Sequence, residues 1–348
     1  MRSVAGITRD YRPGAAQRSG FERSIEAITR HDPGVASAFA QTSGIALRDC
    51  LTSARQGKAW SGGTLNRNGA PLEFSFSTMS DDLRYTVEVG GPDTSPERRL
   101  ARIDTLLGEL GLDPGWDGIA RQFPDLQRSA TLTYGAWLGI RHRRAGTSGP
   151  ATTFKIYAEI PNAAATTALL TDYLGAPVLP NGEAQLRLLG GTPDSDRCEL
   201  YFELSQARPA VSTLTRLLAR SGLAARQNDL LELIRSFHFR RDGGPDTLPE
   251  AQYGFSYSVL PGGRDPVFSI FVLPSALAGG DGYLRRELLI SALGRGWSLG
   301  CYGALTRPLA QRLFQSGFHN MLTFSIDAGL ALGLQVSLSP PPEFIHDD

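Results

Sequence analysis

The sequence predicts an α+β fold, a ten-stranded antiparallel β-barrel with a polar lumen surrounded by a ring of α-helices. Two observations lead to this prediction. Ten segments alternate polar and apolar residues with the period of a strand, and they form five hairpins separated by segments of helical periodicity. The polar faces of these strands also carry Arg, Lys and Tyr at matching positions, which favours an enclosed lumen over an open, solvent-exposed sheet.

The elements follow one another in αββα order, so the chain reads as an internal repeat. After two helical segments, PLEFSFS and LRYTVEV alternate with period two between Gly, Asp and Ser, which is typical of a hairpin. Ser95 and Pro96 begin a helix that ends at Gly111, and the cycle then recurs. The expected strands are 71–77, 83–89, 131–140, 153–160, 184–189, 197–204, 252–259, 267–273, 319–326 and 330–338. The expected helices are 21–30, 35–53, 95–111, 116–122, 163–174, 210–221, 226–237 and 283–293.

The two faces of the strands differ in polarity. Every second residue of 83–89, 154–160, 198–204 and 332–338 is apolar, and the residues between them are mostly polar. We expect the apolar faces to pack beneath the helices and the polar faces to line the lumen. A barrel of ten strands is wide enough to enclose a ligand.

Composition limits the class of protein. The 348 residues are 41% hydrophobic, which is enough for a large core, and the 35 basic and 35 acidic side chains cancel. Zero net charge argues against nucleic-acid or membrane-surface binding, and neither a spanning segment nor a signal peptide is evident. With three cysteines that form no disulfide pattern, we expect a cytoplasmic protein. We expect a monomer, because a closed barrel has no free sheet edge. The expected organisation is a flexible leader over 1–20, one domain over 21–340 and a tail over 341–348.

Three strand motifs carry a resemblance to a known family. LEFSFSTMSDDLRYTVEV has an acidic residue followed eleven positions later by Arg, KIYAEIP has Lys-x-Tyr, and RCELY matches Arg-x-Lys-x-Tyr in part. Together they resemble the aromatic prenyltransferases of the ABBA or PT-barrel fold, in the dimethylallyltryptophan synthase branch of indole prenyltransferases. The motif matches lie almost entirely within 70–205. The matching residues are Glu73, Arg84, Lys155, Tyr157, Arg197 and Tyr201.

The resemblance implies that a prenyl group moves from a prenyl diphosphate, such as dimethylallyl diphosphate, to an electron-rich aromatic acceptor in secondary metabolism. The expected acceptor is an indole, as a tryptophan-derived small molecule or a peptide. Cationic side chains would neutralise the departing diphosphate, and tyrosine rings would stabilise the allylic cation. The residues expected at the diphosphate are Arg84, Lys155, Tyr157, Arg197 and Tyr201.

Glu73 is the expected catalytic carboxylate. In the family this residue accepts the indole N–H hydrogen bond and helps to remove the proton that restores aromaticity. A structural ion pair between Glu73 and Arg84 is the alternative. The residues expected in the lumen or at the acceptor are Trp137, Phe271, His319 and Gln335, with His319 expected as a satisfied core or lumen histidine.

The chain also departs from the family pattern. Glu199 replaces the middle Lys of the third motif, and the late strands lack the shielding tyrosines. A transferase acting on phenols, a prenyl cyclase and a non-catalytic barrel that binds a hydrophobic ligand therefore remain alternatives.

No metal or cofactor is expected. Asp81 and Asp82 are followed by LRY, so the Asp-rich magnesium motif of other prenyl-diphosphate enzymes is incomplete, and we expect this pair to form a hairpin turn. The histidines show no metal-ligand spacing. We expect Mg²⁺ not to be essential.

Overall fold

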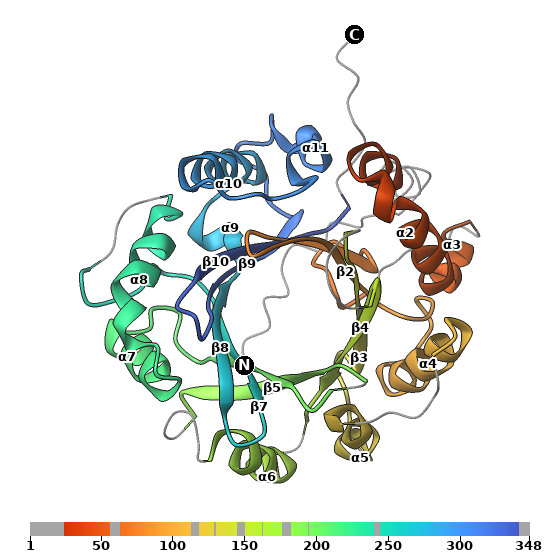
Figure 1. The fold of residues 1–348 in the computed structure, drawn as a ribbon, viewed down its shortest axis with the longest axis horizontal. Coiled ribbons are helices and arrows are strands. Elements are labelled where there is room, and N and C mark those ends of the chain that lie inside the picture. The colour runs from red at the N-terminus through yellow and green to blue at the C-terminus, as the bar shows by residue number, and fades with distance from the viewer. Residues whose placement is uncertain are drawn as a thin grey trace.

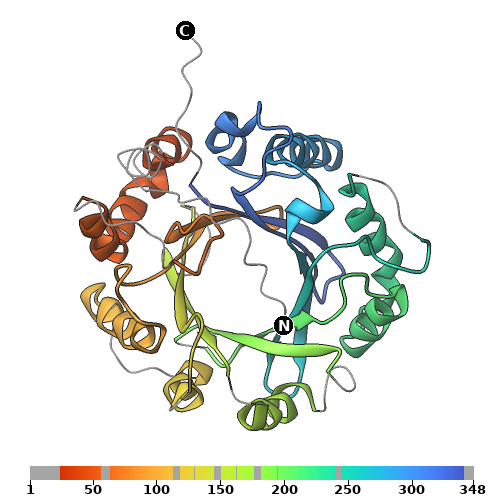
Figure 2. The same cartoon turned by 180° about the vertical axis from the view of Figure 1, so that it is seen from behind.

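Ten antiparallel strands form one closed barrel, and the helices surround it as an outer ring (Figure 1), which Figure 2 shows from behind. This confirms the predicted fold class. The expected leader over 1–20 and tail over 341–348 lie outside the described residues, so the domain boundaries stay expectations. The computed structural model describes residues 24–55, 63–112, 118–128, 130–144, 150–161, 163–175, 182–193, 195–239 and 244–340.

Strands that are neighbours along the chain are neighbours in the sheet, and β1 pairs with β10 to close the barrel. Every strand edge is thereby hydrogen-bonded. The strands are β1 (Leu72–Ser77), β2 (Ser80–Val87), β3 (Ala136–His142), β4 (Thr152–Glu159), β5 (Ala184–Gly191), β6 (Cys198–Leu204), β7 (Tyr253–Leu260), β8 (Arg264–Val272), β9 (His319–Ile326) and β10 (Leu332–Leu338).

The helices between the hairpins pack one apolar stripe against the barrel. In α7, for example, Leu214, Leu217 and Leu218 are buried. None of the described helices has the length and apolar character needed to cross a membrane. The helices are α2 (Pro33–Ala46), α3 (Arg48–Arg55), α4 (Pro96–Glu109), α5 (Phe123–Gln127), α6 (Ala163–Leu174), α7 (Val211–Arg220), α8 (Gln227–Ser236), α9 (Pro274–Leu277), α10 (Asp281–Arg295) and α11 (Tyr302–Leu305), with 3₁₀ turns η1 (Gly118–Gln122), η2 (Ala224–Arg226) and η3 (Arg307–Leu309).

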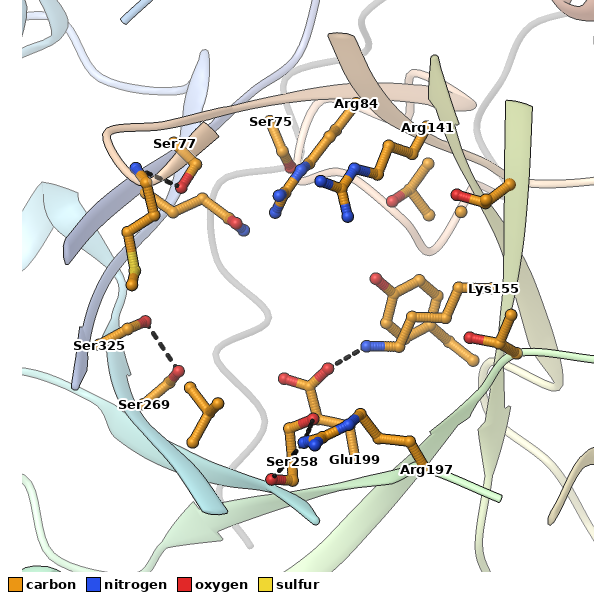
Figure 3. A pocket seen from close by; sticks show the side chains of 18 of the residues that line it. Ser75, Ser77, Arg84, Arg141, Lys155, Arg197, Glu199, Ser258, Ser269 and Ser325 are labelled. Atoms are coloured by element: carbon orange, nitrogen blue, oxygen red, sulfur yellow. Dashed lines mark hydrogen bonds and ion pairs between the residues drawn. The ribbon is translucent and has the colours of Figure 1, made fainter. Parts of the chain in front are cut away.

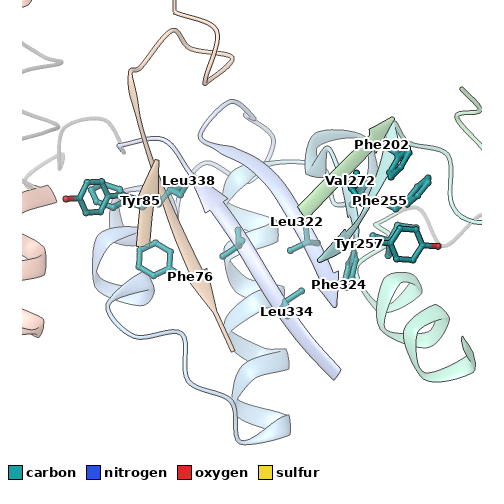
Figure 4. Packing of buried hydrophobic residues seen from close by; sticks show 14 of the residues in the cluster. Phe76, Tyr85, Phe202, Phe255, Tyr257, Val272, Leu322, Phe324, Leu334 and Leu338 are labelled. Atoms are coloured by element: carbon teal, nitrogen blue, oxygen red, sulfur yellow. The ribbon is translucent and has the colours of Figure 1, made fainter. Parts of the chain in front are cut away.

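The hydrophobic core lies between the barrel wall and the helices (Figure 4). The outward residues of the strands fill it, as parity predicts: in β6, Leu200 and Phe202 are buried on this side. Phe202 stacks on Phe255 of β7 with ring centroids 4.7 Å apart. Full burial of one such side chain contributes about 1.5–3 kcal/mol. The apolar wall therefore leaves the opposite faces of the strands free to form a polar lumen.

Several strand boundaries differ from the prediction, and two of these differences bear on the site. β2 begins at Ser80, so the expected turn at Asp81 and Asp82 is wrong: both residues lie in the strand. β3 begins at Ala136 rather than at 131. The segment before it forms a loop because the Glu159 carboxylate accepts hydrogen bonds from the amides of residues 133–135, which removes them from sheet pairing.

Candidate active site in the barrel lumen

The lumen contains two connected cavities. The first has a volume of about 560 Å³ and the second about 410 Å³. The cavities meet at residues that line both of them, and we call this junction the waist: Ser75, Thr86, Tyr157, Glu199, Tyr201, Ser269, Ser325 and Gln335. Volumes of this size suit small organic ligands.

Four cationic side chains from four hairpin strands or their ends project into the first cavity (Figure 3). The three predicted cations, Arg84, Lys155 and Arg197, are brought together here. Arg141 on β3 is a fourth, and it pairs directly with Arg84 in the β2–β3 ladder. Sequence reasoning missed Arg141 because the expected strand stopped at 140, although strand parity places it on the same face as Trp137.

Most of this positive charge already has a protein partner. Lys155 forms an ion pair with Glu199, and its Nζ lies 3.2 Å from the Tyr201 hydroxyl. The same Nζ lies 5.0 Å from the ring centre of Tyr157, close enough for a cation–π contact. Arg197 pairs with Asp265 at the mouth of the barrel and donates to the Ser258 carbonyl at 3.2 Å.

Arg84 differs from the other three cations. Arg141 is neutralised by Asp82, whereas no side-chain hydrogen bond or ion pair joins Arg84 to another residue in the described part of the chain. The Nε of Arg84 is buried without an acceptor. Burial, followed by the nearby Arg141 charge, lowers the pKa of Arg84. An unsatisfied cation facing a cavity is a natural contact for an anionic ligand.

The Lys155–Glu199 pair is held in its charged form. Burial acts to raise the pKa of Glu199, but the Lys155 charge and hydrogen bonds from Lys155, Tyr201 and Ser256 outweigh it, so the pKa lies below its usual range. For Lys155, burial lowers the pKa, and the attraction to Glu199 more than compensates.

The second cavity combines aromatic walls with the carboxylate of Glu73, with which no cation pairs among the described residues. Glu73, Trp137, Phe271 and Gln335 all line it. Asn320 donates to Glu73 Oε2 at 3.0 Å. Burial raises the pKa of Glu73 to about 7, although hydrogen bonds from Ser337 and Asn320 oppose the rise.

The alternative role expected for Glu73, an ion pair with Arg84, is wrong. Among the described ion pairs none joins these two residues, and Arg84 lines only the first of the two cavities. Glu73 is therefore a carboxylate without a neutralising cation among the described residues, which explains its raised pKa.

The second cavity also holds a polar group that the sequence did not indicate. Arg187 donates to Glu203 at 2.8 Å through Nε, and Gln252 donates to the same carboxylate at 2.9 Å. The three residues line the cavity together. The sequence does not indicate this cluster, because its members are far apart along the chain and only the barrel register brings β5, β6 and the start of β7 side by side.

His319 does not face the lumen, so that part of the expectation is wrong. Its ring lies in the helix layer, 2.9 Å from the Tyr302 hydroxyl and 2.7 Å from Asp281 Oδ1. The register shifts between Ser337 and Leu338, which interrupts the alternation of β9 and turns His319 outward. Its satisfied, buried state agrees with a core histidine.

No three His, Cys, Asp or Glu side chains gather in a metal-binding arrangement within the described ranges. Asp82, from the incomplete Asp-rich motif, is bound instead to Arg141, and Asp81 Oδ2 lies 3.6 Å from Arg144. The two aspartates point to different partners because neighbouring strand residues face opposite sides of the sheet.

The fold is similar to that of several solved structures. A 6-dimethylallyltryptophan synthase is similar over 95% of this chain and 99% of its own, with a TM-score of 0.71 and 16% identity. The 5-dimethylallyltryptophan synthase from Streptomyces coelicolor gives a TM-score of 0.67, 16% identity and coverage of 93% and 96%. The prenyltransferase PriB, in a ternary complex with L-tryptophan and dimethylallyl thiolodiphosphate, is similar with a TM-score of 0.69 and 17% identity. The match covers 94% of this chain and 97% of the PriB chain. No family model and no curated protein matches the sequence.

These similarities confirm the PT-barrel fold that the three strand motifs implied. At 16–17% identity they show the fold alone, and the argument for function has to come from the lumen itself.

Proposed function

We propose that this protein is an aromatic prenyltransferase that moves an allylic prenyl group from a prenyl diphosphate to an indole acceptor. One observation carries the proposal: a cavity with four cations opens, through a waist that includes two tyrosines, onto an aromatic cavity in which the Glu73 carboxylate has no neutralising cation among the described residues. The first suits a leaving anion, the waist suits an allylic cation, and the second suits an electron-rich ring.

The diphosphate would bind in the first cavity. Arg84 supplies the unsatisfied guanidinium, and Lys155 and Arg197 approach from β4 and the start of β6. A guanidinium binds phosphate oxygens through two parallel hydrogen bonds. Fixed positive charge around the leaving oxygens stabilises the negative charge that develops as the C–O bond breaks.

The allylic cation would form at the waist. The rings of Tyr157 and Tyr201 lie there with centroids 5.8 Å apart. The Lys155 ammonium lies within cation–π distance of both rings. Aromatic faces stabilise a cation by about 0.5–2 kcal/mol each without reacting as a basic nucleophile would. Enclosure by the barrel wall also restricts water, which would otherwise capture the cation.

The acceptor ring would lie in the second cavity, between Trp137 and Phe271. After the C–O bond to diphosphate breaks and leaves the allylic cation, the ring carbon bonds to the prenyl carbon, and the proton from that ring carbon passes to Glu73. A base with a pKa of about 7 is well matched to this transfer at neutral pH.

The Arg187–Glu203 pair offers opposite charges for the carboxylate and ammonium of an amino-acid acceptor. Tryptophan, which is bound in the PriB complex, fits this arrangement. The same chemistry would also prenylate the indole ring of a tryptophan residue in a peptide.

The proposal includes metal independence, because fixed side-chain cations stand where a divalent ion would otherwise neutralise the diphosphate. It also keeps the expectation of a cytoplasmic monomer. The closed barrel supports a monomer, since it offers no sheet edge for a second copy.

The direct test is incubation with dimethylallyl diphosphate and L-tryptophan in the presence of EDTA. We expect diphosphate release to match the formation of prenylated tryptophan mole for mole. Indole peptides and phenols, with dimethylallyl, geranyl and farnesyl diphosphate, would define the acceptor and donor. Diphosphate release with a cyclised donor and no acceptor product would indicate a cyclase, and no release with any combination would leave a binding protein and overturn the proposal.

A further inference from the structure

We propose that Glu199 is a built-in counter-ion of the donor site, which takes up one proton when a prenyl diphosphate binds and so makes donor binding proton-coupled. The inference rests on the proposed function, because it concerns the same cavity. It starts from a feature that the diphosphate chemistry does not explain: a carboxylate placed among the cations that should receive an anion.

Glu199 occupies the centre of the lumen. It lines both cavities, lies on the inner face of β6 between Arg197 and Tyr201, and forms an ion pair with Lys155 across β5 (Figure 3). Its second oxygen, Oε1, accepts a hydrogen bond from Ser256 at 3.1 Å. Both oxygens are therefore held by protein partners, and the carboxylate stays beside the cations of the first cavity.

A diphosphate in the first cavity must approach Lys155, and hence Glu199. Three of the four cations of this cavity already form an ion pair with a carboxylate, so little positive charge is available to a second anion. Two like charges at close range inside a protein repel strongly, and protonation of the weaker acid removes the repulsion. Glu199 is the carboxylate nearest the waist, where the donor's reacting end would lie.

The charged neighbours of Glu199 decide whether its carboxylate is ionised or protonated. Before the donor arrives, cations dominate and the carboxylate is ionised. Its partners on β5 and β7 are uncharged, namely Gly190, Ser256 and Ser258. The titratable or charged groups that face it are Lys155 and Tyr157 from β4, Arg197 and Tyr201 from β6, with Arg197 itself paired to Asp265, and Arg84 from β2.

The proton balance is simple. Solvent gives one proton to a carboxylate oxygen of Glu199 as the diphosphate binds, and the neutral acid then donates a hydrogen bond to a phosphate oxygen. Lys155 exchanges its carboxylate partner for the phosphate. When the diphosphate leaves, the proton returns to solvent and the Lys155–Glu199 pair forms again. No covalent bond of the protein changes.

The test is calorimetric titration with dimethylallyl thiolodiphosphate, which binds without reacting rapidly, in two buffers of different ionisation enthalpy. At pH 7.5 the wild type should take up about one proton more per donor than Glu199→Gln, since the proton uptake of the donor itself is common to both. Between pH 7 and 8.5 donor affinity of the wild type should fall towards tenfold per pH unit more steeply than that of Glu199→Gln. At pH 8.5 the variant should bind the donor more tightly than the wild type.

Asp82→Asn is the matched control, because it removes a carboxylate paired with a cation of the same cavity, Arg141. It should keep the full proton uptake. Glutamine retains the size of Glu199 and its hydrogen bond from Ser256, and thermal unfolding will verify that the variant is folded. Equal proton uptake by wild type and Glu199→Gln, or weaker donor binding by the variant at pH 8.5, overturns this inference alone. Absence of donor binding by both proteins overturns the proposed function with it.

Discussion

Replacing Arg84 with Gln is expected to lower the rate of diphosphate release by about 10²–10³-fold, the usual cost of removing one preorganised charge-stabilising donor. Within the described residues Arg84 is the cation of the first cavity that no carboxylate neutralises. It therefore offers more charge to the diphosphate than its paired neighbours do. Glutamine keeps two hydrogen-bonding groups and most of the length but removes the charge. A continuous assay of released diphosphate, with donor and acceptor both saturating, measures the effect.

Stability separates this effect from unfolding. Arg84 is half-buried, and its Nε is buried without a partner, so its removal should leave the midpoint of urea unfolding unchanged or slightly higher. Arg208→Gln is the control, because Arg208 is an exposed arginine that pairs with Glu250 on the surface. It should retain full activity. Diphosphate release by Arg84→Gln at more than half the wild-type rate would remove Arg84 from the donor site.

Replacing Glu73 with Gln is expected to have opposite effects on activity and on stability. Loss of the base should lower the rate of prenyl transfer by about 10²–10⁴-fold. The rate for the wild type should rise with pH through about 7, as Glu73 loses its proton, and the variant should lose that dependence. A pH–rate profile of product formation tests both statements.

The stability effect follows from the direction of the pKa shift. Burial raises the pKa of Glu73 in the folded protein to about 7, so the stability linked to this proton is present below the ordinary glutamate range and is lost as pH rises through about 7. At pH 8 the ionised carboxylate destabilises the fold by up to about 3 kcal/mol, which glutamine avoids. Urea unfolding at pH 8 should therefore show a more stable variant, and at pH 4 the two proteins should be nearly equal.

Glu250→Gln, at an exposed site, should change neither the rate of prenyl transfer nor the stability to urea. A variant that lost activity and was also destabilised at pH 8 would show that Glu73 is a structural residue rather than a buried base.

The fold was predictable because strand parity and helix periodicity are local signals. The helix Ala163–Leu174 and the strand His319–Ile326 have the expected bounds, and the apolar faces lie where alternation places them. The bulge that turns His319 outward could not be predicted, since it depends on the register between β9 and β10. Likewise the start of β3 depends on a carboxylate, Glu159, that is 24 residues away from Gly135 in the chain.

For the site, the short motifs predicted which residues would meet and not how they are paired. Arg84, Lys155 and Arg197 do line one cavity. Asp265 lies outside those motifs, and Asp82 lies within the first motif but was expected in a turn, so the sequence alone could not show that Arg84 is left unneutralised. The same holds for Arg187 and Glu203, whose contact exists only in the closed barrel.

The central claim is that cations from separate hairpins meet one diphosphate inside the barrel. A crystal structure with dimethylallyl thiolodiphosphate and L-tryptophan tests it most directly. The account predicts phosphate oxygens within hydrogen-bonding distance of Arg84, Lys155 and Arg197, with the indole beside Glu73 in the second cavity. A diphosphate bound outside the lumen, or at Arg187 at the opposite end, would contradict it.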